Sequence, residues 1–220
     1  PFYLEEQGIM MNMNFPPIRP SHLILDLGGV LVRLKSVDWL WPETDQPEIA
    51  TRPEQIWRTS STVKAYETGR IKDSETFYRA ARREMGITVD KETFFTHFPG
   101  LIGELFAETI PLLTRLQASC TLYLLSNIGE THWIYCRDQL GLDSFFQQTF
   151  LSYEMGLLKP DPRIFRQMVQ SINQPLSDIC YFDDRQENIE AALRLGIFGL
   201  VTTGARGLRK HLYDLRLLDC

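Results

Sequence analysis

Four short polar segments carry the side chains of this chain that could do chemistry. They are Asp26-Leu27-Gly28-Gly29, Ser126-Asn127, Lys159 and Asp183-Asp184. Neighbouring carboxylates keep their charge most easily around a hard divalent cation, and oxygen ligands together with a phosphate substrate favour Mg²⁺. A lysine ammonium would offset the negative charge of a phosphoryl group. The set is therefore typical of phosphate chemistry at a magnesium site.

The expected role of each segment follows from its charge and from the hydrogen-bonding groups that it carries. The carboxylate of Asp26 can attack phosphorus only after its repulsion from phosphate has been screened by a cation and by Lys159. Glycines allow a tight turn in which backbone amides point at phosphate oxygens. Hydroxyl and amide side chains add neutral donors to those oxygens. The predicted catalytic residues are Asp26, Lys159 and Ser126, and the predicted substrate-binding residues are Leu27, Gly28, Ser126, Asn127 and Lys159.

Apolar runs predict the strands that must position these groups. Near-continuous apolar strands belong to parallel sheets that are covered on both faces. In such open sheets, ligands bind outside the carboxyl ends of the strands, so the four polar segments are expected to meet at one edge. The predicted strands are residues 22–27, 120–126, 148–153, 179–183 and 196–201.

Helical patterns alternate with these runs. Asp161 is predicted to cap a helix that begins at Pro162, and a second helix is predicted to end at Gly196. Alternating strands and helices predict an α/β fold with a Rossmann-like parallel sheet and helices on both faces.

Residues 36–103 interrupt this alternation and are called the cap segment below. They show no convincing strand pattern, but they hold helical stretches, one of them after an expected N-cap at Asp73. We interpret them as a small helical insert that follows the first strand. The predicted organisation is an N-terminal extension (1–20), an α/β core (21–35 and 104–220) and the helical cap (36–103).

The composition of the chain argues against several other classes of protein. The net charge is −5 and no Lys/Arg run is present, so no nucleic-acid partner is expected. No apolar run approaches the roughly 20 residues that span a membrane, and residues 1–20 lack the pattern of a signal peptide. The four cysteines form no CxxC pair and are expected to be free thiols. We expect a cytoplasmic monomer or weak homodimer with a small-molecule phosphate substrate.

Four motifs, in order, resemble those of the haloacid dehalogenase superfamily. They are ILDLGGVLV, LLSN, GLLKPDPRIF and YFDDRQENIEAA. The segment YETGRIKDSETF is similar to the helical cap of the subgroup that includes bacterial glucose-1-phosphatase. The resemblance implies a phosphatase in which Asp26 is the nucleophile and forms an aspartyl-phosphate. It implies Mg²⁺ ligation by Asp26, the backbone carbonyl of Gly28 and Asp184, with Asp183 as a ligand or next to one, and a bracing role for Asn188.

One position departs from the pattern of the family. Most of the phosphatases carry a second aspartate two positions after the nucleophile as general acid and base, and here that position is Gly28. General acid catalysis contributes roughly 10²–10⁴-fold to rates. The substrate could have a good leaving group, a cap residue or a water could supply the proton, or the protein could be a poor catalyst.

Three alternatives to a phosphatase remain open at this point. A 2-haloacid dehalogenase would also lack the second aspartate, but it uses no metal and gains nothing from two carboxylates at Asp183-Asp184. A phosphomutase would need proton transfer from the missing group. Asp26, Lys159 and the Asp183-Asp184 pair argue against a non-enzymatic binding protein, but Gly28 leaves that alternative open.

Overall fold

A parallel five-stranded sheet in the order β5-β4-β1-β6-β7 forms the centre of the molecule. The computed structural model describes residues 19–42, 44 and 47–218. The strands are β1 (His22–Leu25), β4 (Thr121–Ser126), β5 (Gln148–Leu151), β6 (Ile179–Asp183) and β7 (Phe198–Val201). All five predicted strands are present, and the α/β prediction with a Rossmann-like sheet is confirmed. Four are one or two residues shorter than predicted; β1, for example, ends where Asp26 and Leu27 leave the sheet for a turn.

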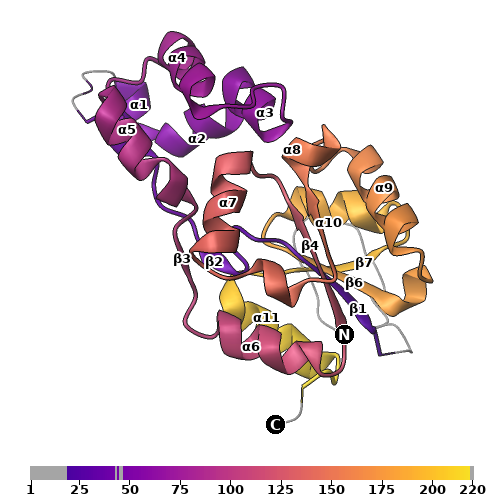
Figure 1. The fold of residues 1–220 in the computed structure, drawn as a ribbon. Helices are drawn as coiled ribbons and strands as arrows, with labels where there is room; N and C mark the ends of the chain where they lie inside the picture. The colour runs from indigo at the N-terminus through magenta and orange to yellow at the C-terminus, as the bar shows by residue number, and fades with distance from the viewer. Residues whose placement is uncertain (1–18, 43, 45–46, 219–220) are drawn as a thin grey trace.

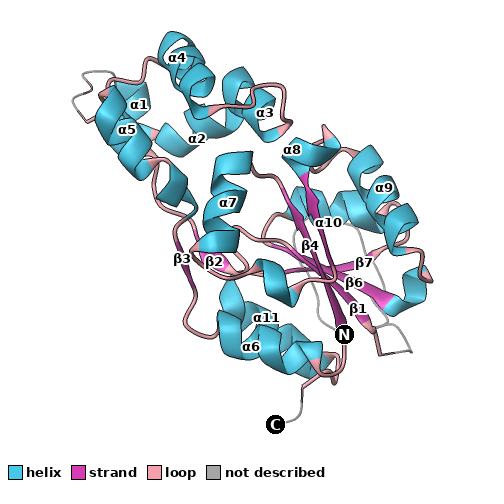
Figure 2. Cartoon of the chain, viewed as in Figure 1, coloured by secondary structure: helices cyan, strands magenta, loops and turns pink. Residues whose placement is uncertain are grey.

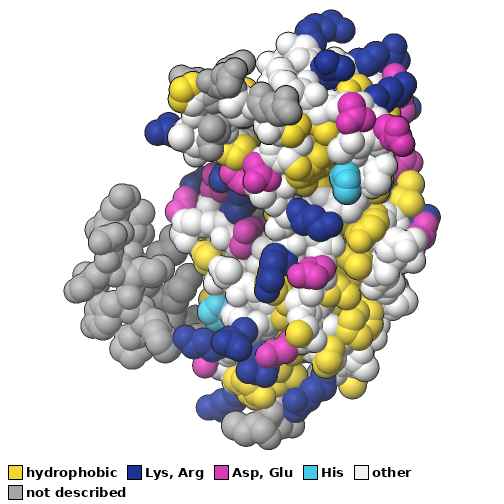
Figure 3. Space-filling view, turned by 90° about the vertical axis from the view of Figure 1, so that its left-hand side faces the viewer, with side chains coloured by type: hydrophobic (Ala, Val, Ile, Leu, Met, Phe, Trp, Pro, Cys, Tyr) yellow, Lys and Arg dark blue, Asp and Glu magenta, His cyan; other side chains and the backbone are white. Residues whose placement is uncertain are grey.

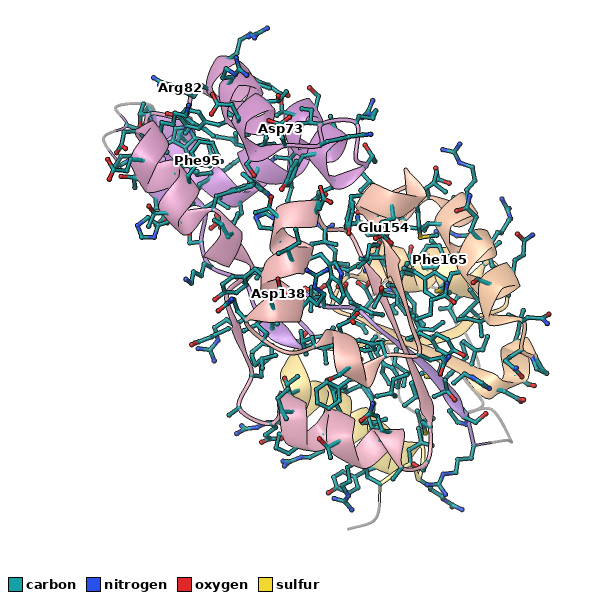
Figure 4. All side chains as sticks on the ribbon, viewed as in Figure 1. Asp73, Arg82, Phe95, Asp138, Glu154 and Phe165 are labelled. Atoms are coloured by element: carbon teal, nitrogen blue, oxygen red, sulfur yellow. The ribbon has the colours of Figure 1, made fainter. Side chains whose placement is uncertain are left out.

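Helices cover both faces of this sheet (Figures 1 and 2). Alternate residues of a strand point to opposite faces, so Leu23 and Leu25 belong to one hydrophobic cluster and Ile24 to another. The first cluster includes residues of α6 (Thr109–Gln117), α7 (Glu130–Asp138) and α11 (Gly204–Asp214). The second includes residues of α9 (Pro162–Ile172), where Phe165 is labelled in Figure 4, and of α10 (Gln186–Leu193).

Two predicted helix starts are confirmed by their capping hydrogen bonds. The side chain of Asp161 accepts from the backbone N–H of Arg163 at 2.9 Å, with Pro162 as the first helical residue. Asp73 accepts from the N–H of Thr76 at 2.8 Å at the start of α4. Short side chains of this type satisfy amides that a helix leaves without an internal partner.

The cap segment forms a helical unit above the sheet (Figure 1) with a hydrophobic cluster of its own. Its centre is aromatic: the ring centroids of Phe77 and Phe98 lie 5.0 Å apart, and those of Phe94 and Phe98 lie 4.6 Å apart. Its helices are η1 (Asp38–Leu40), α1 (Pro47–Thr51), α2 (Pro53–Thr59), α3 (Ser61–Glu67), α4 (Ser74–Met85), α5 (Lys91–His97) and η2 (Pro99–Ile102). The assignment of residues 36–103 to a separate cap stays a prediction.

A short antiparallel ribbon that the sequence analysis did not predict joins the cap segment to the core. It consists of β2 (Val32–Arg33) and β3 (Glu104–Leu105). Two-residue strands are too short to show an alternating pattern, so the sequence contains no signal for them. The remaining elements are η3 (Asp143–Phe145), α8 (Ser152–Met155) and η4 (Leu176–Asp178).

The outer surface carries charges of both signs. On the face drawn in Figure 3, basic and acidic side chains are interspersed rather than gathered into a single stripe. Within the described ranges, no helix combines the length and the apolar character needed to cross a membrane. Cys120, Cys136 and Cys180 are buried free thiols, whereas Cys220 and the predicted N-terminal extension up to residue 18 lie outside the described residues.

Candidate active site

The ammonium group of Lys159 lies at the centre of the site. Its Nζ is 2.7 Å from Oδ1 of Asp26 and 2.7 Å from Oδ2 of Asp183, and it donates a third bond of 2.9 Å to the carbonyl of Leu125. All three charged side chains are buried. A buried lysine keeps its charge only with partners of this kind, and burial works to lower its pKa while Asp183 and Asp26 together hold that pKa above its ordinary value.

The sheet topology explains why these residues meet. β1 is the central strand and pairs with β4 on one side and β6 on the other. Leu25 is in register with Phe182, so the next residues along the two strands, Asp26 and Asp183, emerge side by side. Ser126 ends β4 on the opposite side of β1 and is also buried. The structure thus brings Asp26, Lys159 and Asp183 into direct contact at the predicted edge.

Asn127 holds the loop that carries Lys159. Its Oδ1 accepts from the backbone N–H of Lys159 at 2.8 Å, and its Nδ2 donates to the carbonyl of Lys159 at 3.0 Å. Both ends of the side-chain amide are therefore used to position the lysine. The predicted contact between Asn127 and substrate stays a prediction.

The carboxylate of Asp183 is fully occupied by protein donors. Oδ2 accepts from Tyr181 Oη as well as from Lys159, and Oδ1 accepts from Asn188 Nδ2 at 2.8 Å and from the N–H of Arg185 at 2.9 Å. Burial opposes its ionisation, but Lys159 and these hydrogen bonds together keep the pKa of Asp183 below its ordinary value. Asp183 therefore acts structurally as the anchor of the lysine.

Tyr181 was not identified from the sequence, although a signal for it exists. Residues two apart on a strand point to the same face, so a tyrosine two positions before Asp183 could have been placed beside it. The bracing position implied for Asn188 agrees with its hydrogen bond to Asp183.

The acidic cluster fits a hard divalent cation. Oxygen atoms of Asp26, Asp183 and Asp184 lie within 4.8 Å of one another. Burial raises the pKa of Asp26 to about 7; Lys159 opposes this shift, while Asp183 and Asp184 add to it. Burial and the charge of Asp183 also raise the pKa of Asp184. Three carboxylates against one ammonium leave an excess of negative charge that a cation with oxygen ligands would balance.

The turn after Asp26 is shaped by a glycine and by backbone hydrogen bonds. Gly29 has φ +74°, and a Cβ added there would overlap the carboxylate of Asp184. The N–H of Gly29 donates to the carbonyl of Val32 at 2.9 Å, so this amide is not available to a phosphate. Within the described part of the chain, the N–H groups of Leu27 and Gly28 have no internal acceptor. Leu27 and Gly28 are two of the residues predicted to bind substrate, and that role stays a prediction.

Solved structures and characterised sequences resemble this chain. A haloacid dehalogenase family enzyme from Bacteroides thetaiotaomicron, in complex with magnesium and inorganic phosphate, superimposes with a TM-score of 0.69 at 25% identity over 84% of this chain and 94% of that one. The D-ribitol-5-phosphate phosphatase of the same species is 24% identical over 189 residues, 80% of this chain and 88% of its own length.

A third relative is much longer than this chain. The drimenol cyclase drtB of Aspergillus calidoustus is 26% identical over 178 residues, and the match covers 80% of this chain but only 32% of the cyclase. The chain therefore spans about a third of the length of that relative. Residues 20–196 match the haloacid dehalogenase-like hydrolases, and the chain belongs to that family.

Proposed function

We propose that this chain is a Mg²⁺-dependent phosphatase that hydrolyses a small phosphorylated metabolite through an aspartyl-phosphate on Asp26. The observation that carries the proposal is the arrangement around Lys159, whose ammonium bridges Asp26 and Asp183 at 2.7 Å each. Asp184 completes a cluster of three carboxylates beside it. Lys159 thereby orients Asp26 and supplies positive charge where a phosphoryl group would bind.

Two displacements account for the reaction. An oxygen of Asp26 forms a bond to phosphorus while the bond to the leaving oxygen breaks, and its electron pair stays on that oxygen. Water then attacks the phosphorus of the aspartyl-phosphate, which releases inorganic phosphate and restores the carboxylate of Asp26. A bound Mg²⁺, held by Asp26, Asp184 and the Gly28 carbonyl, would offset charge on the phosphoryl oxygens. The free amides of Leu27 and Gly28 and the hydroxyl of Ser126 are the proposed donors to those oxygens.

Sugar phosphates and related polyol phosphates are the proposed substrate class. The support is the phosphate-bound solved structure and the relative named for D-ribitol 5-phosphate. A dehalogenase is disfavoured because a halide-releasing site needs no cation, whereas three carboxylates here lie within 4.8 Å of one another. A phosphomutase would need the aspartyl-phosphate to survive while the dephosphorylated product reoriented in the site. A binding protein has no use for a carboxylate nucleophile held by a buried lysine.

Hydrolysis of p-nitrophenyl phosphate tests this proposal. We expect turnover with Mg²⁺, its loss in excess EDTA, and its recovery when Mg²⁺ is restored. Asp26→Asn should lower turnover by at least about 10³-fold, since the amide is not a nucleophile. Asp138→Asn, which changes an exposed aspartate on α7 (Figure 4), is the matched control and should retain full activity. Chloride release from a 2-chloro acid without metal, or full activity of Asp26→Asn, would refute the proposal.

A further inference from the structure

The end of α3 is the place where the cap segment contacts the catalytic edge of the sheet. The hydroxyl of Ser152, directly after β5, donates to the backbone carbonyl of Glu67 at 2.6 Å. The same hydroxyl accepts from the N–H of Ile128 at 2.9 Å, two residues beyond Ser126. Glu67 therefore lies beside the end of β4, although the cap segment is remote from it in sequence.

The backbone on both sides of Glu67 is held against the core. The hydroxyl of Tyr66 accepts from the N–H of Thr131 at 3.2 Å, and the ring of Tyr66 lies so close to Gly129 that no Cβ would fit there. Gly69 approaches the carbonyl of Tyr153 equally closely. These contacts leave the main chain at Glu67 little freedom, so the docking of the cap segment fixes the point from which the Glu67 side chain extends.

The carboxyl group of Glu67 has no structural partner of its own. It is partly buried, and among the described residues it forms neither a hydrogen bond nor an ion pair. Burial raises the pKa of Glu67 to about 7, against the opposing charges of Arg185 and Lys159, which lie within electrostatic reach. The helix α8 that packs against α3 contributes Tyr153 and Glu154, whose side chains bond to each other at 2.9 Å.

The other acidic groups of the site are already committed. Asp26 is the proposed nucleophile, the carboxylate of Asp183 accepts four bonds, and Asp184 belongs to the proposed cation site. An alkoxide leaving group still needs a proton, and the water of the second displacement must lose one.

We propose that Glu67 is the general acid and base of the reaction, supplied by the cap segment in place of an acid at Gly28. This assignment rests on the proposed phosphatase function. As the bond from phosphorus to the leaving oxygen breaks, protonated Glu67 gives its proton to that oxygen and becomes a carboxylate. In the second step the carboxylate accepts a proton from the water that attacks the aspartyl-phosphate, and Glu67 returns to its starting form.

Pre-steady-state kinetics of Glu67→Gln with Mg²⁺ and p-nitrophenyl phosphate test the assignment. The p-nitrophenolate leaving group hardly needs a proton, so the first turnover should proceed at close to the wild-type rate. The second step loses its base, so steady turnover should fall by about 10²–10⁴-fold. The expected trace is a burst of p-nitrophenolate close to one per enzyme, followed by a slow phase. A purely structural role of Glu67 would not separate the two phases.

Two variants complete the experiment. Glu154→Gln changes an exposed carboxylate on the neighbouring α8 (Figure 4) and should behave as wild type. Gly28→Asp in the Glu67→Gln background should restore part of the steady turnover; its Cβ would come within 3.1–3.2 Å of the side chain of Leu34, which is 53% exposed and can move.

The outcomes separate the two proposals. Steady turnover of Glu67→Gln within about threefold of wild type, or equal loss of both phases in a variant that melts at the wild-type temperature, would overturn the role of Glu67. If Glu67→Gln does not fold, Glu67→Asp takes its place in the experiment. This variant keeps an ionisable carboxyl group, so the proposal requires that its turnover show no slow second phase. A wild-type protein that is inactive with Mg²⁺ would instead refute the phosphatase proposal itself.

Discussion

The three-way contact of Lys159 with Asp26 and Asp183 is the feature at the residue scale on which the site depends. Breaking a buried ion pair by removing one partner typically costs about 3–5 kcal/mol, because the remaining charge is left without compensation. Here the same ammonium also orients the proposed nucleophile. The requirements of folding and of chemistry therefore coincide at Lys159, and variants of this lysine would not separate them.

Gly29→Ala gives a cleaner test at the residue scale. The added Cβ would overlap the carboxylate of Asp184 at a position with φ +74°, so we expect Asp184 to be displaced and Mg²⁺-dependent turnover to fall by at least about tenfold. A steep rise in the Mg²⁺ concentration needed for half-maximal activity would report the same displacement.

Gly86→Ala is the matched control for that substitution. Gly86 ends α4 with φ +65° and has no atom within 4 Å of its added Cβ. Both variants carry the strain of a left-handed alanine, roughly 1–2 kcal/mol, but only Gly29→Ala should change the Mg²⁺ dependence. Equal Mg²⁺ dependence in the two variants would show that Asp184 is not displaced.

At the scale of elements, α7 of the core is tied to the end of α5 in the cap segment by one buried histidine. His132 on α7 lies with Nε2 3.0 Å from the carbonyl of Phe98, and their rings are 4.5 Å apart. Burial lowers the pKa of His132 from 6.5 to about 4, and the bond to Phe98 opposes this only in part. The neutral ring is therefore the form that fits between the two elements.

This histidine predicts how stability depends on pH. Between about pH 6.5 and pH 4, the unfolded chain binds a proton at His132 that the folded chain does not, so the stability from this group is present above pH 6.5 and is lost as the pH falls. The loss is on the order of 3 kcal/mol. Urea unfolding of wild type and His132→Gln at pH 7 and pH 4.5 measures it, and the wild type should lose more stability over that interval. An identical loss in both proteins would contradict the prediction.

For the molecule as a whole, the carboxylates that meet at the site come from distant parts of the chain, so a cation that binds them should stabilise the entire fold. A ligand at a hundred times its Kd adds about 2.7 kcal/mol of stability. In a protein of this size that corresponds to an increase in Tm of about 5–10 °C. Thermal unfolding with Mg²⁺ and with EDTA should show this difference.

Asp184→Asn is the control for the thermal measurement. It removes one charged ligand while keeping the shape of the side chain, so the shift in Tm produced by Mg²⁺ should largely disappear. An equal shift in Asp184→Asn and wild type would mean that the cation binds elsewhere.

The sequence by itself determined the five strands of the parallel sheet and the edge of that sheet at which the polar groups meet. Apolar runs in the sequence directly predict buried strands. The helix caps at Asp73 and Asp161 are also predictable, because each is a hydrogen bond between residues that are close together in the sequence. The gathering of Asp26, Lys159 and Asp183 could be expected because parallel strands end at a common edge.

Only the tertiary structure decided which atoms at that edge are in contact and which part of the cap segment lies beside them. The sequence does not show that Asn127 uses its amide on the Lys159 loop or that Gly29 leaves room for Asp184. Glu67 was overlooked for the same reason. Its proximity to the core results from the docking of cap helices on Ser152 and Gly129, and such packing between distant segments has no periodicity that a single sequence can reveal.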